Sequence, residues 1–191
     1  MKGKFVIELT RKSLLALSIV FATACLVLSW FVIVLLQKIH FLSIFAHGQA
    51  IDRQLLPGLL FGVTAGFFSL FLLKKPVFRE LRKLFQYVIT EPKLSVFDIF
   101  FISLVAGVSE EILFRAGIQP LIGIWWSSLL FISLHGYFNP RNRRTSLYGL
   151  LMFLVSVGLG FLYERVGLVA AVSAHAAVDM VILYGLYVDV D

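Results

Sequence analysis

Apolar runs long enough to cross a lipid bilayer recur along the whole chain. A transmembrane helix needs roughly 20 residues to cross a hydrocarbon core of about 30 Å. The runs are Leu14–Leu36, Leu55–Leu73, Phe97–Ile122, the shorter Ile124–His135, Leu147–Tyr163 and Gly167–Tyr187. This pattern predicts an all-α, polytopic membrane helical bundle with about six transmembrane helices. Residues 1–191 are expected to form a single integral-membrane domain.

Composition favours the same class of protein. Hydrophobic residues make up 60% of the chain and charged residues 15%, whereas an ordinary soluble domain carries about 25% charged residues. The first apolar run continues through SWFVIVLLQ, well past the 7–15 residues of a signal peptide, so we expect it to remain as the first span. The single cysteine, Cys25, excludes an internal disulfide framework and is expected to be a packing residue.

The distribution of lysine and arginine predicts the orientation. Most of the 17 basic residues fall in segments 1–12, 74–93 and 141–144, which would all lie on one side of the membrane. The other side carries only Lys38, Arg53 and Arg165. By the positive-inside rule, both termini are expected to be cytoplasmic, in a bacterial inner membrane. The net charge of +6 is then explained by topology and attraction to anionic lipid, and no nucleic-acid binding is expected.

One charged segment has helical periodicity. Apolar residues of FRELRKLFQYVI, residues 78–89, recur at helical spacing, and Arg79, Arg82 and Lys83 lie on the other flank. This pattern predicts an amphipathic helix on the cytoplasmic surface, although a plain solvated connector would fit it as well.

Three ionisable residues interrupt the third apolar run, in VSEEILFRAG. Glu111 and Arg115 are four residues apart, so they share a helix face and can pair. Glu110 lies about 100° round the helix and must find another partner. The spacing therefore predicts one structural carboxylate, Glu111, and one chemically active carboxylate, Glu110.

Two histidines and an aspartate also fall within apolar runs. His135 ends the fourth run, whereas His175 and Asp179 are four residues apart on the last. Polar residues in membrane helices usually face the bundle interior, so these three side chains are expected to converge with Glu110. Any one of them alone could be structural, but polar groups on three different helices favour a functional cluster. Tyr148, like the other span tyrosines, is expected to be an interfacial or packing residue.

Three motifs at these residues resemble a known family. EEILFR, FISLH and HAAVD are similar, in order, to the EExxxR, FxxxH and HxxxN/D signatures of the CAAX-protease and bacteriocin-processing (CPBP, or Abi) family of intramembrane endopeptidases. The resemblance covers about residues 97–187. The third motif ends in Asp179, where the eukaryotic prenyl-protein proteases have asparagine, and a carboxylate cannot donate a hydrogen bond unless it is protonated.

The resemblance implies a role for each residue. Glu110, with His135, would activate a water that attacks the scissile carbonyl. His175 and Asp179 would support the oxyanion or fix the water, and Glu111 and Arg115 would support the site structurally. The implied substrate is a membrane-anchored or lipidated peptide or protein, cut near its C-terminus.

The sequence leaves two questions open, the cofactor and the class of function. No cofactor is favoured, but zinc is an alternative, because His135, His175 and a carboxylate from Asp179 or Glu110 form a recognised ligand set. The rival functions are a non-enzymatic bacteriocin immunity protein that binds a toxin, and a small transporter that relays protons along the same residues.

Overall fold

The computed structural model describes residues 10–138 and 142–189, and its regular elements within those ranges are all helical. The α-helices are α1 (Arg11–Trp30), α2 (Ile51–Leu73), α3 (Arg79–Thr90), α4 (Val96–Glu111), α5 (Gln119–Leu134), α6 (Arg143–Arg165) and α7 (Leu168–Tyr187). Two π-helical segments, Phe31–Leu36 and Ile112–Ile118, continue α1 and α4, and short 3₁₀ helices cover Phe41–Ala46 and Pro76–Phe78. The predicted all-α membrane bundle is confirmed.

Within the described residues, four helical segments are long and apolar enough to cross a membrane by length and composition. They are Arg11–Leu36, Ile51–Leu73, Arg143–Arg165 and Leu168–Tyr187. The third predicted span corresponds to α4 and its π-helical continuation, and it carries Glu110, Glu111 and Arg115, which lower its hydropathy. The total of six spans therefore stays a prediction.

The helix that follows is broken at Gly123. Its backbone there has φ 81° and ψ 167°, a conformation that glycine adopts readily because it lacks a Cβ. The break falls between the predicted third span and the predicted short helix that ends at His135. The last part of α5 can thus turn back into the bundle and bring His135 toward α4.

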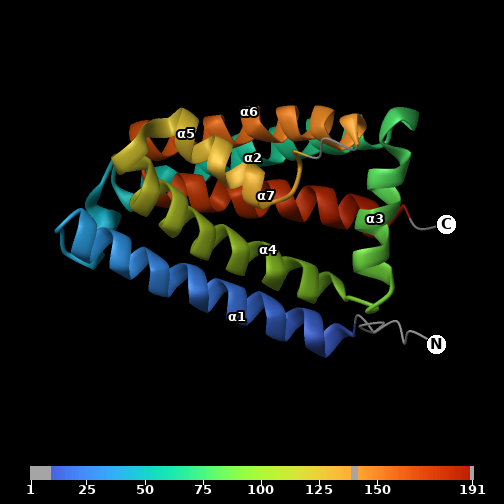
Figure 1. Ribbon diagram of the computed structural model, residues 1–191, viewed down its shortest axis with the longest axis horizontal. Coiled ribbons are helices and arrows are strands. Elements are labelled where there is room, and N and C mark those ends of the chain that lie inside the picture. Colours follow the sequence, from blue (N-terminus) through green and yellow to red (C-terminus); the bar gives the residue numbers. More distant parts are fainter. Residues whose placement is uncertain (1–9, 139–141, 190–191) are drawn as a thin grey trace.

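Figure 1 shows how the helices are arranged. Helices α1, α2, α4, α6 and α7 run along the bundle, and α3 crosses one end of it. The start of α1 and the end of α7 lie at that same end. This arrangement agrees with the prediction that the two ends of the bundle's chain lie on one side of the membrane.

Helices α2 and α7 make the most extensive contact in the bundle. Three buried glycines of α2, Gly58, Gly62 and Gly66, face α7. A Cβ added at Gly62 would overlap the carbonyl oxygen of Ala174, so the two backbones touch directly. Small residues permit this close approach in membrane helices, where van der Waals packing replaces the hydrophobic effect as the source of association.

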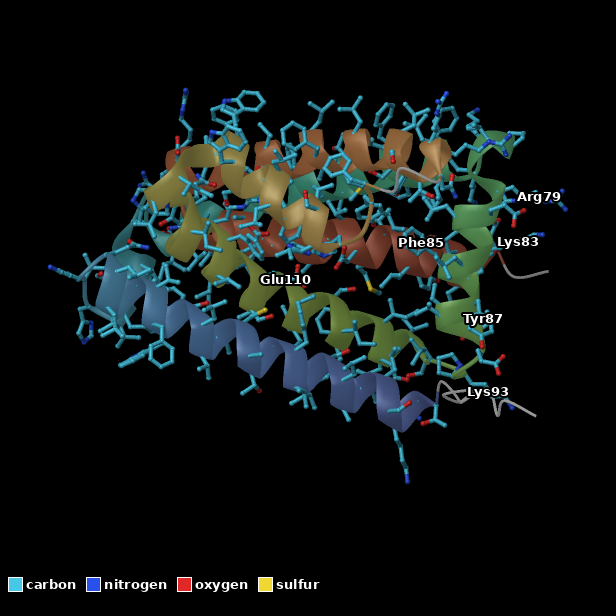
Figure 2. The ribbon with its side chains drawn as sticks, viewed as in Figure 1. Arg79, Lys83, Phe85, Tyr87, Lys93 and Glu110 are labelled. Carbon is cyan, nitrogen blue, oxygen red and sulfur yellow. The ribbon has the colours of Figure 1, made fainter. Side chains whose placement is uncertain are left out.

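The predicted amphipathic helix is α3, and its apolar side packs on protein. Leu81 and Ile89 are buried in the main core cluster, and Phe85 packs against it. Figure 2 shows Phe85 on the bundle side of α3, whereas Arg79 and Lys83 point away from the bundle. The helix therefore caps the end of the bundle with a basic outer face.

Capping residues define where α4 begins. The side chain of Ser95 accepts a hydrogen bond from the backbone N–H of Asp98, whose carboxylate in turn accepts one from the N–H of Ser95. Asp98 is buried and pairs with Arg11 of α1 at 2.8 Å. This contact fixes the start of α4 against the start of α1.

Candidate active site

Glu110 lies near the end of α4, about midway along the bundle (Figure 2). The residue is only 5% exposed. Its Oε2 atom makes no hydrogen bond to any of the described residues, and it lies 3.4 Å from Nε2 of His135 and 4.0 Å from Nε2 of His175. A buried carboxylate oxygen without a hydrogen bond is costly, which is the usual mark of a functional group rather than a structural one.

His135 reaches Glu110 from the end of α5. Its Nδ1 lies 2.8 Å from the carbonyl oxygen of Phe131, and since a carbonyl can only accept, Nδ1 carries a proton. The other ring nitrogen, Nε2, therefore faces Glu110 with its lone pair when the imidazole is neutral. The two groups are placed to exchange one proton with each other or with a water between them.

His175 of α7 is held in the same way. Its Nδ1 lies 2.7 Å from Oε1 of Glu111, whose second oxygen accepts from Arg115. A carboxylate paired with arginine stays ionised and only accepts, so Nδ1 of His175 is the donor. Its Nε2 then faces Oδ2 of Asp179 at 3.5 Å and Oε2 of Glu110 at 4.0 Å. The structure thus brings together all four residues predicted as catalytic, although their roles stay predictions.

Arg115 is the centre of a buried hydrogen-bond network. Its side chain and that of Glu111 are both fully buried. Its Nε donates to Glu111 at 2.9 Å and its Nη2 to Ser156 at 2.8 Å. Its Nη1 donates to Gln119 at 3.3 Å and to Ser128 at 3.2 Å. The network therefore ties the end of α4 to α5 and α6, and through Glu111 to α7.

A cavity of about 130 Å³ opens in front of Glu110. Its polar lining consists of Glu110, His135, Tyr137, Ser156, His175 and Asp179. This volume exceeds the roughly 30 Å³ that one water occupies in the liquid, so it can hold a water together with part of a peptide. The cavity explains why Glu110 is buried yet reachable.

One polar residue of the cavity lining, Tyr137, was not predicted; it follows His135 by two residues in the connection between α5 and α6. Burial, reinforced by the charges of Asp179 and Glu110, raises the pKa of Tyr137. Its hydroxyl therefore keeps its proton and remains a hydrogen-bond donor. An aromatic residue with a polar end beside the FISLH motif is the one signal that could have identified it.

Two apolar grooves reach Glu110 from the side of α1. One has a volume of about 320 Å³ and includes Leu17, Phe21 and Ala106. The other, about 450 Å³, includes Cys25 and Phe114 and also reaches His135. The site is therefore approached from the lipid-facing side of the bundle as well as from the cavity.

The zinc alternative would draw its ligands from the same residues. The described parts of the chain hold no group of three or more His, Cys, Asp or Glu side chains placed as metal ligands. Nε2 of His135 and of His175 both face Oε2 of Glu110, so the zinc alternative concerns these three side chains and that of Asp179.

Residues 92–181 match the family model described as Rce1-like, type II CAAX prenyl endopeptidase. This segment, just under half of the chain, is similar to the Rce1-like family. The matched segment, residues 92–181, contains every predicted site residue. The match confirms the resemblance inferred from the three motifs. It begins just before α4 and ends within α7, so α1 and α2 lie outside it.

A curated protein is also similar to part of this chain. The uncharacterized protein YpbD of Bacillus subtilis (strain 168) is 36% identical over 90 residues, which cover 47% of this chain and 46% of that protein. The similarity thus spans about half of each protein. No solved structure matches the chain significantly.

Proposed function

We propose that this protein is an intramembrane endopeptidase that hydrolyses a peptide bond with a water activated by Glu110 and His135. The observation that carries the proposal is Oε2 of Glu110, which has no hydrogen-bond partner among the described residues and faces Nε2 of two histidines at 3.4 and 4.0 Å beside a cavity. A carboxylate that is not held in a structural ion pair is available to accept a proton as a general base.

The proposed reaction begins with proton transfer from water to Glu110, assisted by His135. The water oxygen attacks the carbonyl carbon and forms a tetrahedral intermediate whose former carbonyl oxygen is negatively charged. His175, when it is an imidazolium, donates from Nε2 to this oxyanion, and Asp179 lies 3.5 Å from the same nitrogen. Collapse of the intermediate breaks the C–N bond, and the proton returns from the Glu110–His135 pair to the leaving amine.

Glu111 and Arg115 support this chemistry without taking part in it. Because Glu111 binds Nδ1 of His175 and Arg115 binds Glu111, the imidazole has a fixed tautomer and a fixed orientation. The same positioning of a catalytic imidazole by a buried carboxylate is effective in other hydrolases. We infer that Arg115 is a positioning residue.

The substrate class is proposed from the family and the grooves. The matching family is described as prenyl endopeptidase, and the two apolar grooves beside α1 lead from the lipid-facing side to Glu110. A lipidated or membrane-anchored segment could therefore reach the site from the bilayer. We place both termini on the cytoplasmic side of a bacterial plasma membrane, since the basic outer face of α3 lies at the same end of the bundle as the start of α1.

The experiment that tests this function uses purified protein in liposomes and a fluorogenic peptide that ends in a farnesylated cysteine followed by three residues. We expect cleavage by the wild type and a loss of at least about 100-fold in Glu110→Gln, because general-base catalysis contributes about 10²–10⁴-fold. Glu80→Gln changes an exposed carboxylate of α3 and is the matched control.

The same assay separates the alternatives. Loss of activity with a chelator and recovery with zinc would replace the glutamate mechanism by a metal-dependent one. The toxin-binding function would replace the protease on two results together. The wild type would cut neither this reporter nor membrane-anchored peptides, and cells expressing the wild type or Glu110→Gln would resist a bacteriocin equally.

A further inference from the structure

The cavity in front of Glu110 contains few groups that can donate a hydrogen bond. The carboxylates of Glu110 and Asp179 only accept when ionised. The Nδ1 protons of the two histidines already bind Phe131 and Glu111. Their Nε2 atoms can donate only when the rings are positively charged. Hydrolysis of a peptide bond, however, creates an oxyanion that needs donors already in place.

Two hydroxyl groups remain in the lining, those of Ser156 and Tyr137. Ser156 is buried and its oxygen accepts a hydrogen bond from Arg115, so this oxygen is tied to the structural network, although its O–H can still donate. No hydrogen bond joins the hydroxyl of Tyr137 to the described residues. Of the two, Tyr137 is thus the residue whose hydroxyl is held neither by the Arg115 network nor by another of the described residues.

The ring of Tyr137 is held beside the catalytic histidine. It lies parallel to the ring of His135, with the centroids 6.2 Å apart and an interplanar angle of 9°. On its other side it contacts the ring of Tyr148 at 5.8 Å. A Cβ added at Gly149 of α6 would stand 2.8 Å from Cβ of Tyr137, so α6 also packs closely on this residue. A donor used in catalysis must be held rigidly in this way.

We propose that Tyr137 is a further catalytic residue, whose hydroxyl donates a hydrogen bond to the scissile carbonyl oxygen and to the oxyanion formed from it. This inference rests on the proposed peptidase function. When the water activated by Glu110 adds to the carbonyl carbon, the C=O π electrons move to the oxygen, and the O–H of Tyr137 stabilises that charge without transferring its proton. The hydrogen bond relaxes when the C–N bond breaks and the carbonyl re-forms.

The test compares Tyr137→Phe with Tyr148→Phe in the farnesylated reporter assay. Both variants remove one hydroxyl and keep the ring. The hydroxyl of Tyr148 is buried, lies outside the cavity lining, and has no hydrogen-bond partner among the described residues. We expect kcat to fall about 100-fold in Tyr137→Phe with KM within about twofold, since loss of one oxyanion donor costs about 10²–10³-fold. Tyr148→Phe should retain the kcat of the wild type.

A second reporter, with sulfur in place of the scissile carbonyl oxygen, distinguishes a donor from a structural residue. Sulfur is the weaker hydrogen-bond acceptor, so the wild type should lose more rate on this reporter than Tyr137→Phe does. Equal losses in the two proteins would overturn the proposal. Melting temperatures in detergent check that each variant is folded. If Tyr137→Phe is unfolded, 3-fluorotyrosine at position 137 keeps the shape of the side chain and makes its hydroxyl a stronger donor. An unchanged cleavage rate with 3-fluorotyrosine would also overturn the proposal.

The outcomes separate this inference from the function on which it rests. If the wild type cleaves, Glu110→Gln does not, and Tyr137→Phe cleaves within threefold of the wild type, then the inference fails and the peptidase function stands. If the wild type itself cuts neither reporter, both fail together. A large fall in kcat confined to Tyr137→Phe supports both.

Discussion

Replacing Arg115 by methionine should destabilise the protein strongly. The change keeps a long unbranched side chain but removes the arginine that pairs with Glu111, and both side chains are fully buried. It also removes the hydrogen bonds that Arg115 donates to Gln119, Ser128 and Ser156. What remains is a carboxylate without its cation in the bundle interior.

The magnitude follows from what is left behind. Removing one partner of a buried ion pair typically costs 3–5 kcal/mol of unfolding free energy, because the other charge stays buried. Glu111 keeps one partner here, since Nδ1 of His175 lies 2.7 Å from its Oε1. We therefore expect a loss near the lower limit, about 3 kcal/mol. The double variant Glu111→Gln/Arg115→Met should be more stable than Arg115→Met alone, because it leaves no charge unpaired.

Reversible unfolding in mixed micelles with increasing SDS measures these differences, with the fluorescence of the three tryptophans as the signal. Lys83→Met is the control, because Lys83 is 57% exposed and lies 3.8 Å from Glu80, and exposed ion pairs contribute little to stability. The reasoning is refuted if Arg115→Met loses less than about 1 kcal/mol, or if the double variant is less stable than the single one.

Three further predictions concern packing, access and topology. Gly62→Ala should cost about 1–3 kcal/mol of unfolding free energy, because its Cβ would overlap the carbonyl of Ala174. Gly117→Ala should be neutral, since the nearest atom to its Cβ would be 3.5 Å away. The same SDS titration compares the two variants. Alkylation of Cys25, which lines the groove leading to Glu110, with a long-chain thiol reagent should slow cleavage of the farnesylated reporter, and Cys25→Ala should abolish that inhibition. In the Cys25→Ala background, Lys83→Cys should react with a membrane-impermeant maleimide only from the cytoplasmic side. Labelling of Lys83→Cys in intact cells from outside would contradict the proposed orientation.

The sequence predicted those parts of the fold that depend on local spacing. The break at Gly123 and the pairing of Glu111 with Arg115 follow from a glycine between two apolar runs and from an i,i+4 separation. The meeting of His135 and His175 around Glu110 follows from the rule that polar residues of membrane helices face the interior. These predictions needed no knowledge of how the helices pack.

The pairing of Glu111 with His175 could not be predicted, because it joins residues 64 apart in the sequence and depends on how α7 packs on α4. Ser128 and Ser156 were missed because single serines are common in apolar helices. One signal was present: a guanidinium has five N–H donors, and Glu111 alone cannot satisfy them. Arg115 within an apolar segment therefore required further acceptors from other helices.

The π-helical segment Ile112–Ile118 affects how this protein can vary in length. A π-helix holds one more residue per hydrogen-bonded turn than an α-helix, and this segment lies between Glu111 and the start of α5. Deletion of one residue there would let the backbone return to α-helical bonding and leave the helix that follows close to its present rotation, because the π-turn holds the extra residue. The same deletion in an α-helical stretch would rotate everything that follows by about 100°. Provided that Arg115 is kept, this span therefore tolerates a one-residue change in length better at the π-turn than in its α-helical part.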